Sequence, residues 1–131
     1  MATPHILVVD DEESILEFVS WALTEEGYKV TCAPNGKAAL ETLEKMSPDL
    51  ILLDLRMPVM DGQAFLDAYQ RQEGPRAPVV VLTAGSQSPK GLESASAFLP
   101  KPFDLGNLLT VIERHTVASA TLEVGRIRQK Q

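Results

Sequence analysis

The run Leu50-Ile51-Leu52-Leu53-Asp54 decides the fold of this chain. Four consecutive apolar residues that end on an acid are typical of a strand buried on both faces of a parallel sheet, because a half-exposed strand would alternate apolar and polar residues. The same form appears in two other runs, His5-Ile6-Leu7-Val8-Val9 before Asp10-Asp11 and Pro78-Val79-Val80-Val81-Leu82 before Thr83. Since chemistry in open parallel sheets collects beyond the carboxyl ends of the strands, these polar residues are candidate site residues.

Helix and strand patterns alternate along the whole chain. Apolar residues recur three or four positions apart after each strand run, which predicts helices. The expected helices cover Ile15 to about Gly27, Gly36 past Leu43, about Gln63 to Gln72, and the residues after Asp104. A short strand at Tyr28–Cys32 and another at Ala97–Pro100, before Lys101, complete the alternation. We therefore expect an α/β fold, a flavodoxin-like doubly wound five-stranded parallel sheet in the order 2-1-3-4-5.

The stretch between Thr83 and Phe98 is the weakest part of this pattern. Its first half holds Gly85, Pro89 and Gly91, which oppose helix continuation. About one turn remains near 92–96, so the fourth helix is expected to be shortened or irregular.

Composition limits the possible functions. The 131 residues suit one domain, 44% of them are apolar, and the net charge is −6. The only basic run, Arg126 to Lys130, is at the C-terminus, so we expect no nucleic-acid partner. No apolar run approaches the ~18 residues of a membrane span and no secretory signal is evident, so we expect no membrane partner and a cytoplasmic location. The single cysteine, Cys32, is expected to be buried, whereas Trp21 lies off the apolar stripe of its helix and should be a partly covered surface ring.

Strand order determines whether the candidate residues meet. In the order 2-1-3-4-5 the first and third strands are neighbours, which brings Asp10, Asp11 and Asp54 into one crevice. Clustered carboxylates repel one another, so the site needs a cation, and magnesium prefers such oxygen ligands. Lys101 would supply a second positive charge, and a screened carboxylate could then attack phosphorus. Taken singly, each residue is ordinary: Asp11 fits a helix cap better than a metal ligand.

Four motifs in order make the chain resemble the response-regulator receiver family, the CheY-like domains of two-component signalling. They are Ile6-Leu7-Val8-Val9-Asp10-Asp11-Glu12, Asp54-Leu55-Arg56-Met57-Pro58-Val59-Met60-Asp61-Gly62, Val81-Leu82-Thr83-Ala84 and Phe98-Leu99-Pro100-Lys101-Pro102-Phe103. The resemblance covers roughly residues 5 to 115. It implies a receiver domain over 1–115, with 116–131 as a C-terminal tail that is either a helical extension or disordered.

The resemblance also implies a role for each site residue. Asp54 would be the phosphoacceptor, and Mg²⁺ would be held by Asp11, Asp54 and the Arg56 backbone carbonyl, with Asp10 behind the direct ligands. Thr83 and Lys101 would bind the phosphoryl group. Thr83 and Phe98 would act as the switch pair, Gly62 would allow the turn into the third helix, and the Lys101-Pro102 bond would be cis.

The resemblance implies a switch rather than an enzyme acting on a separate substrate. A histidine kinase or histidine phosphotransfer protein would donate the phosphoryl group, and an unidentified protein would receive the signal. The alternative is an unphosphorylated interaction module on the same fold. A phosphohydrolase resembling the haloacid dehalogenase group would need Asp-x-Asp, but Glu12 stands two positions after Asp10. A flavin-binding protein would need a hydroxyl-rich phosphate loop after the first strand, where this chain has acids.

Overall fold

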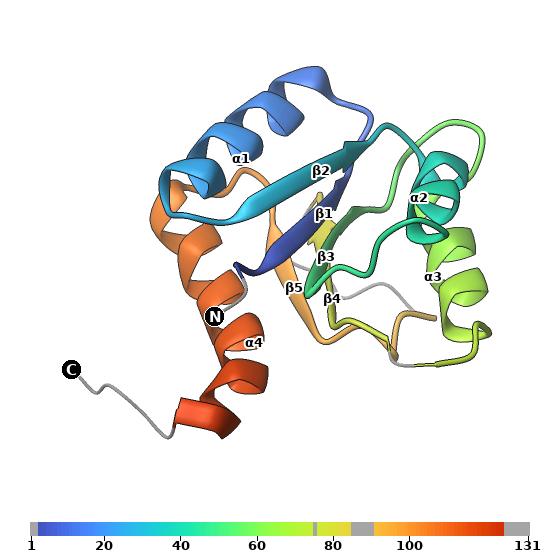
Figure 1. The fold of residues 1–131 in the computed structure, drawn as a ribbon. Helices are drawn as coiled ribbons and strands as arrows, with labels where there is room; N and C mark the ends of the chain where they lie inside the picture. Colours follow the sequence, from blue (N-terminus) through green and yellow to red (C-terminus); the bar gives the residue numbers. More distant parts are fainter. Residues whose placement is uncertain (1–2, 75, 85–90, 125–131) are drawn as a thin grey trace.

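The computed structural model describes residues 3–74, 76–84 and 91–124, with side chains as far as residue 116. Within them, nine elements follow one another along the chain (Figure 1): β1 (His5–Val9), α1 (Glu13–Glu25), β2 (Lys29–Ala33), α2 (Gly36–Leu43), β3 (Leu50–Asp54), α3 (Gly62–Gln70), β4 (Val79–Thr83), β5 (Ala97–Pro100) and α4 (Leu105–Val124). The strands form one parallel sheet in the order β2-β1-β3-β4-β5, which confirms the predicted topology.

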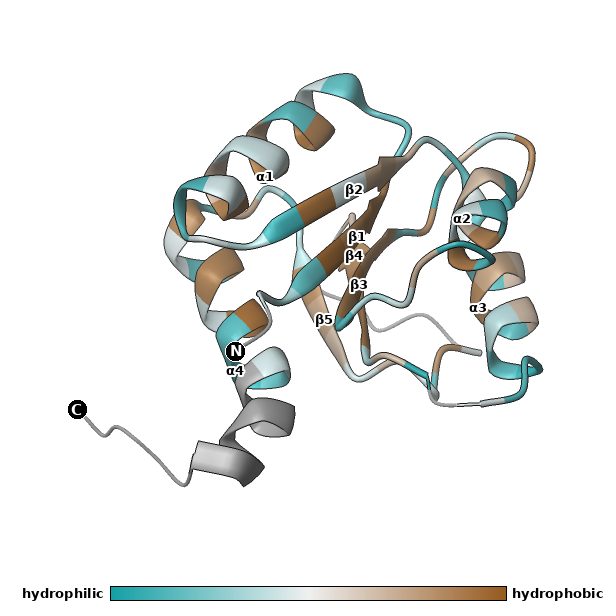
Figure 2. Ribbon diagram, viewed as in Figure 1, coloured by the Kyte–Doolittle hydropathy of each residue, from teal (hydrophilic) through white to brown (hydrophobic). Residues whose placement is uncertain are grey.

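Helices cover both faces of the sheet, α1 and α4 on one face and α2 and α3 on the other (Figure 1). Alternate residues of each central strand enter the two cores. Leu50 and Leu52 of β3 pack toward α1 and α4, whereas Ile51 and Leu53 pack toward α2 and α3. This two-sided burial explains the continuous apolar runs, which colour the central strands brown in Figure 2. The polar ends of these buried strands are therefore held in fixed positions.

In the described residues, the helices α2, α3 and α4 each begin at a short polar side chain. The Asn35 side-chain oxygen accepts a hydrogen bond from the Ala38 N–H at 2.8 Å, and Asp61 accepts one from Ala64 at 2.9 Å. Asp104 caps α4 in the same way, since its Oδ1 accepts the Asn107 N–H at 2.7 Å. Each cap satisfies an N–H group that has no partner inside its helix.

The connection from β4 to β5 contains no helix over its described part. Residues 91–96 form turns, including a hydrogen bond from the Ala95 N–H to the Leu92 carbonyl, while residues 85–90 lie outside the described part. The expectation of a shortened or irregular fourth helix is confirmed for 91–96. Leu92 anchors the segment, because only 2% of it is exposed and it packs into the core between the sheet and α3.

Three other expectations can be compared with the structure. Trp21 is a surface residue with 59% exposure, as predicted. The prediction of a buried Cys32 was wrong, because β2 is an edge strand bonded only to β1 and α1 leaves Cys32 exposed in a shallow groove. The final helix α4 continues without a break past His115 to Val124, so it includes the first part of the expected tail. No helix in the described residues is long and apolar enough to cross a membrane.

Candidate functional site

Three carboxylates meet at the carboxyl end of the sheet. Asp10 follows β1 and Asp54 ends β3, and these neighbouring strands pair Val9 with Leu53 just before the two acids. Asp11 extends from the loop after β1, and oxygens of the three side chains lie within 4.8 Å of one another. Asp10 is fully buried, Asp54 is 7% exposed and Asp11 is exposed. The predicted acidic cluster is therefore present, with one acid open to solvent and one nearly covered.

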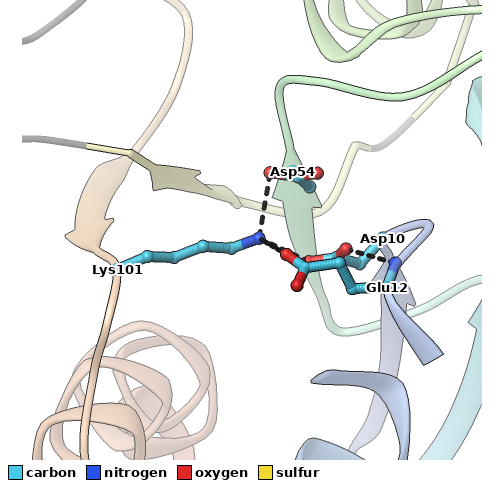
Figure 3. A network of polar contacts seen from close by, with 4 residues as sticks. All are labelled: Asp10, Glu12, Asp54 and Lys101. Carbon is cyan, nitrogen blue, oxygen red and sulfur yellow. Dashed lines mark hydrogen bonds and ion pairs between the residues drawn. The ribbon is translucent and has the colours of Figure 1, made fainter. Parts of the chain in front are cut away.

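Lys101 reaches this cluster from the end of β5, the strand at the edge of the sheet opposite β2. Its backbone N–H donates to the Thr83 carbonyl at 2.6 Å, which fixes the chain after β5 against the end of β4. The side chain then extends over the sheet edge, as Figure 3 shows, and its Nζ lies 3.0 Å from Asp10 Oδ2 and 3.3 Å from Asp54 Oδ1. The Lys101-Pro102 peptide bond is cis, as expected. The sheet thus brings an ammonium group onto the carboxylates from 47 residues beyond Asp54 in sequence.

The charges in this cluster change each other's protonation. Burial is the main cause of a raised pKa for Asp54, the Asp10 carboxylate raises it further, and the Lys101 ammonium opposes both. Partial burial would lower the pKa of Lys101, but its hydrogen bonds to Asp10 and Glu12 outweigh this effect and raise its pKa above the usual value. Lys101 is therefore a permanent cation at neutral pH and compensates part of the acidic charge.

The loop after β3 is held by close backbone contacts. The Gly62 N–H donates to the Leu55 carbonyl at 3.0 Å, and the Gly36 N–H of α2 donates to the Met60 carbonyl at 3.0 Å. A Cβ at Gly62 would lie 2.7 Å from Leu55 Cα and closer still to the Asp54 carbonyl oxygen. Gly62 is thus required because backbone atoms meet there, and the loop that carries Arg56 is tied to both α2 and α3.

The two predicted switch residues lie at different levels of the sheet. Thr83 is 4% exposed and ends β4, next to the strand that carries Asp54. Phe98 is half-buried on β5, where it pairs with Val81 and packs toward the core under α2 and α3. Thr83 shares the sheet edge with the acids, and Phe98 lies farther down the sheet, beside the 91–96 connection.

Glu12 is a site residue that the sequence interpretation missed. Its Oε1 lies 3.1 Å from Lys101 Nζ, and its backbone N–H donates to Asp10 Oδ1 at 2.9 Å (Figure 3). Its position directly after Asp10-Asp11 was visible in the sequence, but a glutamate at a helix start is common enough to carry no signal alone. The N-cap of α1 is Glu12 and not Asp11, so the structure does not support a capping role for Asp11.

The donor chemistry of the cluster fits a magnesium ion. Carboxylate oxygens are the ligands that Mg²⁺ prefers, and it commonly uses one or two of them while keeping several waters. Asp11 and Asp54 offer such oxygens within 4.8 Å of each other, and Asp11 is accessible to solvent. The residues present therefore match the ion that the resemblance implied.

Residues 6–113 match the family model of the response regulator receiver domain. Among curated relatives, the regulatory protein AtoC of Escherichia coli (strain K12) is 36% identical over 117 residues, which cover 86% of this chain and 25% of AtoC. The chain thus spans about a quarter of the length of that relative.

Solved structures agree in fold. The chemotaxis response regulator CheY4 of Vibrio cholerae is 34% identical, with a TM-score of 0.78 over 86% of this chain and 98% of CheY4. The receiver domain of the sensor histidine kinase PA1611 of Pseudomonas aeruginosa PAO1 is 30% identical, with a TM-score of 0.80 over 88% of this chain and 99% of that domain. Its structure holds a magnesium ion in the active-site cleft. From its fold, its acidic cluster with Lys101, and its match over 6–113, the chain belongs to the response regulator receiver domain family.

Proposed function

We propose that this receiver domain is a phosphorylation-dependent switch whose phosphoacceptor is Asp54. The donor would be a histidine kinase or a histidine phosphotransfer protein. A carboxylate oxygen of Asp54 attacks the phosphorus of a phosphohistidine, a P–O bond forms, the P–N bond breaks, and the imidazole leaves with the electron pair. The product is an acyl phosphate on Asp54, which water later hydrolyses within the same site.

The observation that carries this proposal is the position of Lys101. Its ammonium lies 3.3 Å from Asp54 Oδ1 and 3.0 Å from Asp10 Oδ2, and a carboxylate oxygen of the exposed Asp11 lies within 4.8 Å of both acids. Of the two acids beside Lys101, Asp10 is fully buried, whereas Asp54 at the end of β3 keeps 7% exposure and can be reached by a donor. A phosphoryl group on Asp54 would bring additional negative charge to this point. Lys101 is placed to bind one of its oxygens, which stabilises charge as it develops.

Asp11, Asp54 and the backbone carbonyl of Arg56 would hold Mg²⁺, with Asp10 behind them. Bound there, the ion would screen the carboxylates and polarise the phosphoryl oxygens. Asp10 is fully buried and bonded to both Lys101 and the Glu12 N–H, so it would orient the site and not attack.

The switch would act through the connection between β4 and β5. The Thr83 hydroxyl would move to bind a phosphoryl oxygen, and Phe98 would follow into the space this opens. The segment 91–96 lies between them in sequence, has no helix, and is anchored by Leu92. A small movement at its ends would therefore change the surface of this segment, and an output partner would bind the changed surface.

Phosphorylation can be tested with a small-molecule donor. Acetyl phosphate with Mg²⁺ should add one labile phosphoryl group to the wild-type protein, measured by intact mass, and Asp54→Asn should abolish it. Asp61→Asn is the matched control, because Asp61 is a nearby exposed acid and asparagine preserves its helix cap. Undiminished labelling of Asp54→Asn would refute the assignment.

The alternative is an interaction module that works without phosphorylation. It would bind its partner equally well with and without acetyl phosphate, and Asp54→Asn would bind as the wild type does. The complete set of Asp54, Thr83 and Lys101 at one sheet edge favours the switch.

A further inference from the structure

Glu12 occupies the N-cap position of α1 but does not cap it. Side chains at this position commonly accept a hydrogen bond from the first turn of the helix, and serine, threonine, aspartate and asparagine serve best. The Glu12 side chain makes no such bond. It extends away from the helix, and its Oε1 lies 3.1 Å from Lys101 Nζ (Figure 3). The glutamate side chain, which is longer than those of the usual cap residues, therefore pairs with Lys101 and does not cap the helix.

The three N–H groups of the Lys101 ammonium are matched by three carboxylate neighbours in this arrangement. An ammonium carries three N–H groups, and the Nζ has three carboxylate neighbours, Asp10 at 3.0 Å, Glu12 at 3.1 Å and Asp54 at 3.3 Å. A phosphoryl oxygen on Asp54 that binds Lys101 can take the place of Asp54 Oδ1 itself. Because the phosphoryl group carries more negative charge and more oxygens than the carboxylate, it also competes with Asp10 and Glu12 for the remaining N–H groups. The Asp10 side chain is fully buried and would be left without its cation, whereas the Glu12 side chain is 57% exposed and water can solvate it. Glu12 is the partner that can be released at the lowest cost.

We propose that Glu12 is a built-in competitor for Lys101: it holds the ammonium in the unphosphorylated state and is displaced when a phosphoryl group arrives. This inference rests on the proposed phosphorylation of Asp54 and adds a positioning residue that sets how strongly the phosphorylated state is favoured. Glu12 acts through Lys101 and touches neither the phosphorus nor its oxygens.

Two substitutions separate the contact from the charge. Glu12→Gln removes the charge and weakens the pairing with Lys101. Glu12→Asp keeps the charge but shortens the side chain, and aspartate is a good N-cap residue, so its carboxylate should turn back to the helix. Glu13→Gln is the matched control, since Glu13 is the adjacent acid in the first turn of α1. If pairing with Lys101 is what matters, Glu12→Asp will resemble Glu12→Gln.

The first measurement is the acylation rate of Lys101 in metal-free protein, followed by peptide mass spectrometry. Both Glu12 variants should raise it, because one of the three carboxylates around the amine is removed. The second is the affinity for beryllofluoride, a phosphoryl mimic, by calorimetry at saturating Mg²⁺. Exposed ion pairs are weak, so both Glu12 variants should tighten binding by only about two- to fivefold, and Glu13→Gln should not.

The outcomes are distinct. Equal acylation and equal affinity in Glu12→Gln and Glu13→Gln would overturn the proposal. Faster acylation without tighter beryllofluoride binding would also overturn it, since the contact would then exist without competing. Failure of the wild-type protein to bind beryllofluoride, with Lys101 acylated faster in both Glu12 variants, would instead refute phosphorylation at Asp54 while confirming the Glu12–Lys101 contact.

Discussion

Replacing Gly62 by alanine should destabilise the protein and disturb the phosphorylation site together. A Cβ at this position would lie 2.7 Å from Leu55 Cα and even closer to the Asp54 carbonyl oxygen. Both neighbours are backbone atoms, so neither can rotate away, and α3 must shift relative to the end of β3. Overpacking of this kind costs about 1–3 kcal/mol.

An opposing effect must be subtracted. Alanine is a better helix former than glycine by up to ~1 kcal/mol, although Gly62 is only the first residue of α3. The net loss in the free energy of unfolding should therefore be about 1–2 kcal/mol, a clear fraction of the ~5–15 kcal/mol of a typical domain. Urea denaturation followed by circular dichroism measures this loss directly.

Gly106→Ala provides the matched control. Gly106 is also in the first turn of a helix, α4, but a Cβ there would meet only Asp104 Oδ1 at 3.5 Å, an ordinary contact. The same substitution should therefore stabilise the protein by about 0.5–1 kcal/mol. Unchanged or increased stability in Gly62→Ala would show that the backbone approach at the end of β3 is not as tight as the structure indicates.

Three more predictions concern the charges and the irregular connection. Lys101→Met should lower the free energy of unfolding by about 3–5 kcal/mol because Asp10 is left buried without its cation. Added Mg²⁺ should stabilise this variant more than it stabilises the wild type. A loss of stability that Mg²⁺ does not reduce would contradict the explanation by charge. The pKa of Asp54 is raised above its ordinary 3.8, so its charged form destabilises the folded state. Asp54→Asn should therefore be more stable than the wild type at pH 7, and this difference should shrink as the pH falls through the raised pKa toward 4. A difference that grows on acidification would show that ionised Asp54 stabilises the folded state instead. Leu92→Ala should cost about 2–5 kcal/mol and increase amide exchange across 91–96, while the exposed Glu93→Ala should change neither; equal exchange in both variants would show that Leu92 does not anchor the segment.

The sheet and its edge could be predicted because they depend on local patterns. Continuous apolar runs identify strands buried on both faces, and Leu50–Leu53 and Val79–Leu82 are fully inside the structure as expected. Once strand order is assumed, the acids at the strand ends must meet, and the structure brings Asp10, Asp11 and Asp54 together. These inferences needed no knowledge of side-chain directions.

Other features depend on contacts between distant segments. Cys32 was misjudged because the predicted strand order, which already placed its strand at the sheet edge, does not show how much of each side chain α1 leaves uncovered. The role of Glu12 depends on Lys101, which is 89 residues away and arrives from β5. The need for glycine at Gly62 comes from the Asp54 carbonyl and Leu55, not from a turn conformation that sequence rules describe. The irregular connection was predicted because Gly85, Pro89 and Gly91, which oppose helix continuation, can be recognised from the local sequence.

Chemical trapping of the acyl phosphate tests the central claim most directly. Borohydride reduces an aspartyl phosphate to homoserine, so protein treated with acetyl phosphate and Mg²⁺, then reduced and digested, carries a permanent mark at the modified position. We predict homoserine at Asp54 alone, and none when Mg²⁺ is replaced by a chelator. Homoserine at Asp10 or Asp11, or a phosphorylated protein whose Asp54 is intact after reduction, would contradict the assignment of Asp54 as the phosphoacceptor.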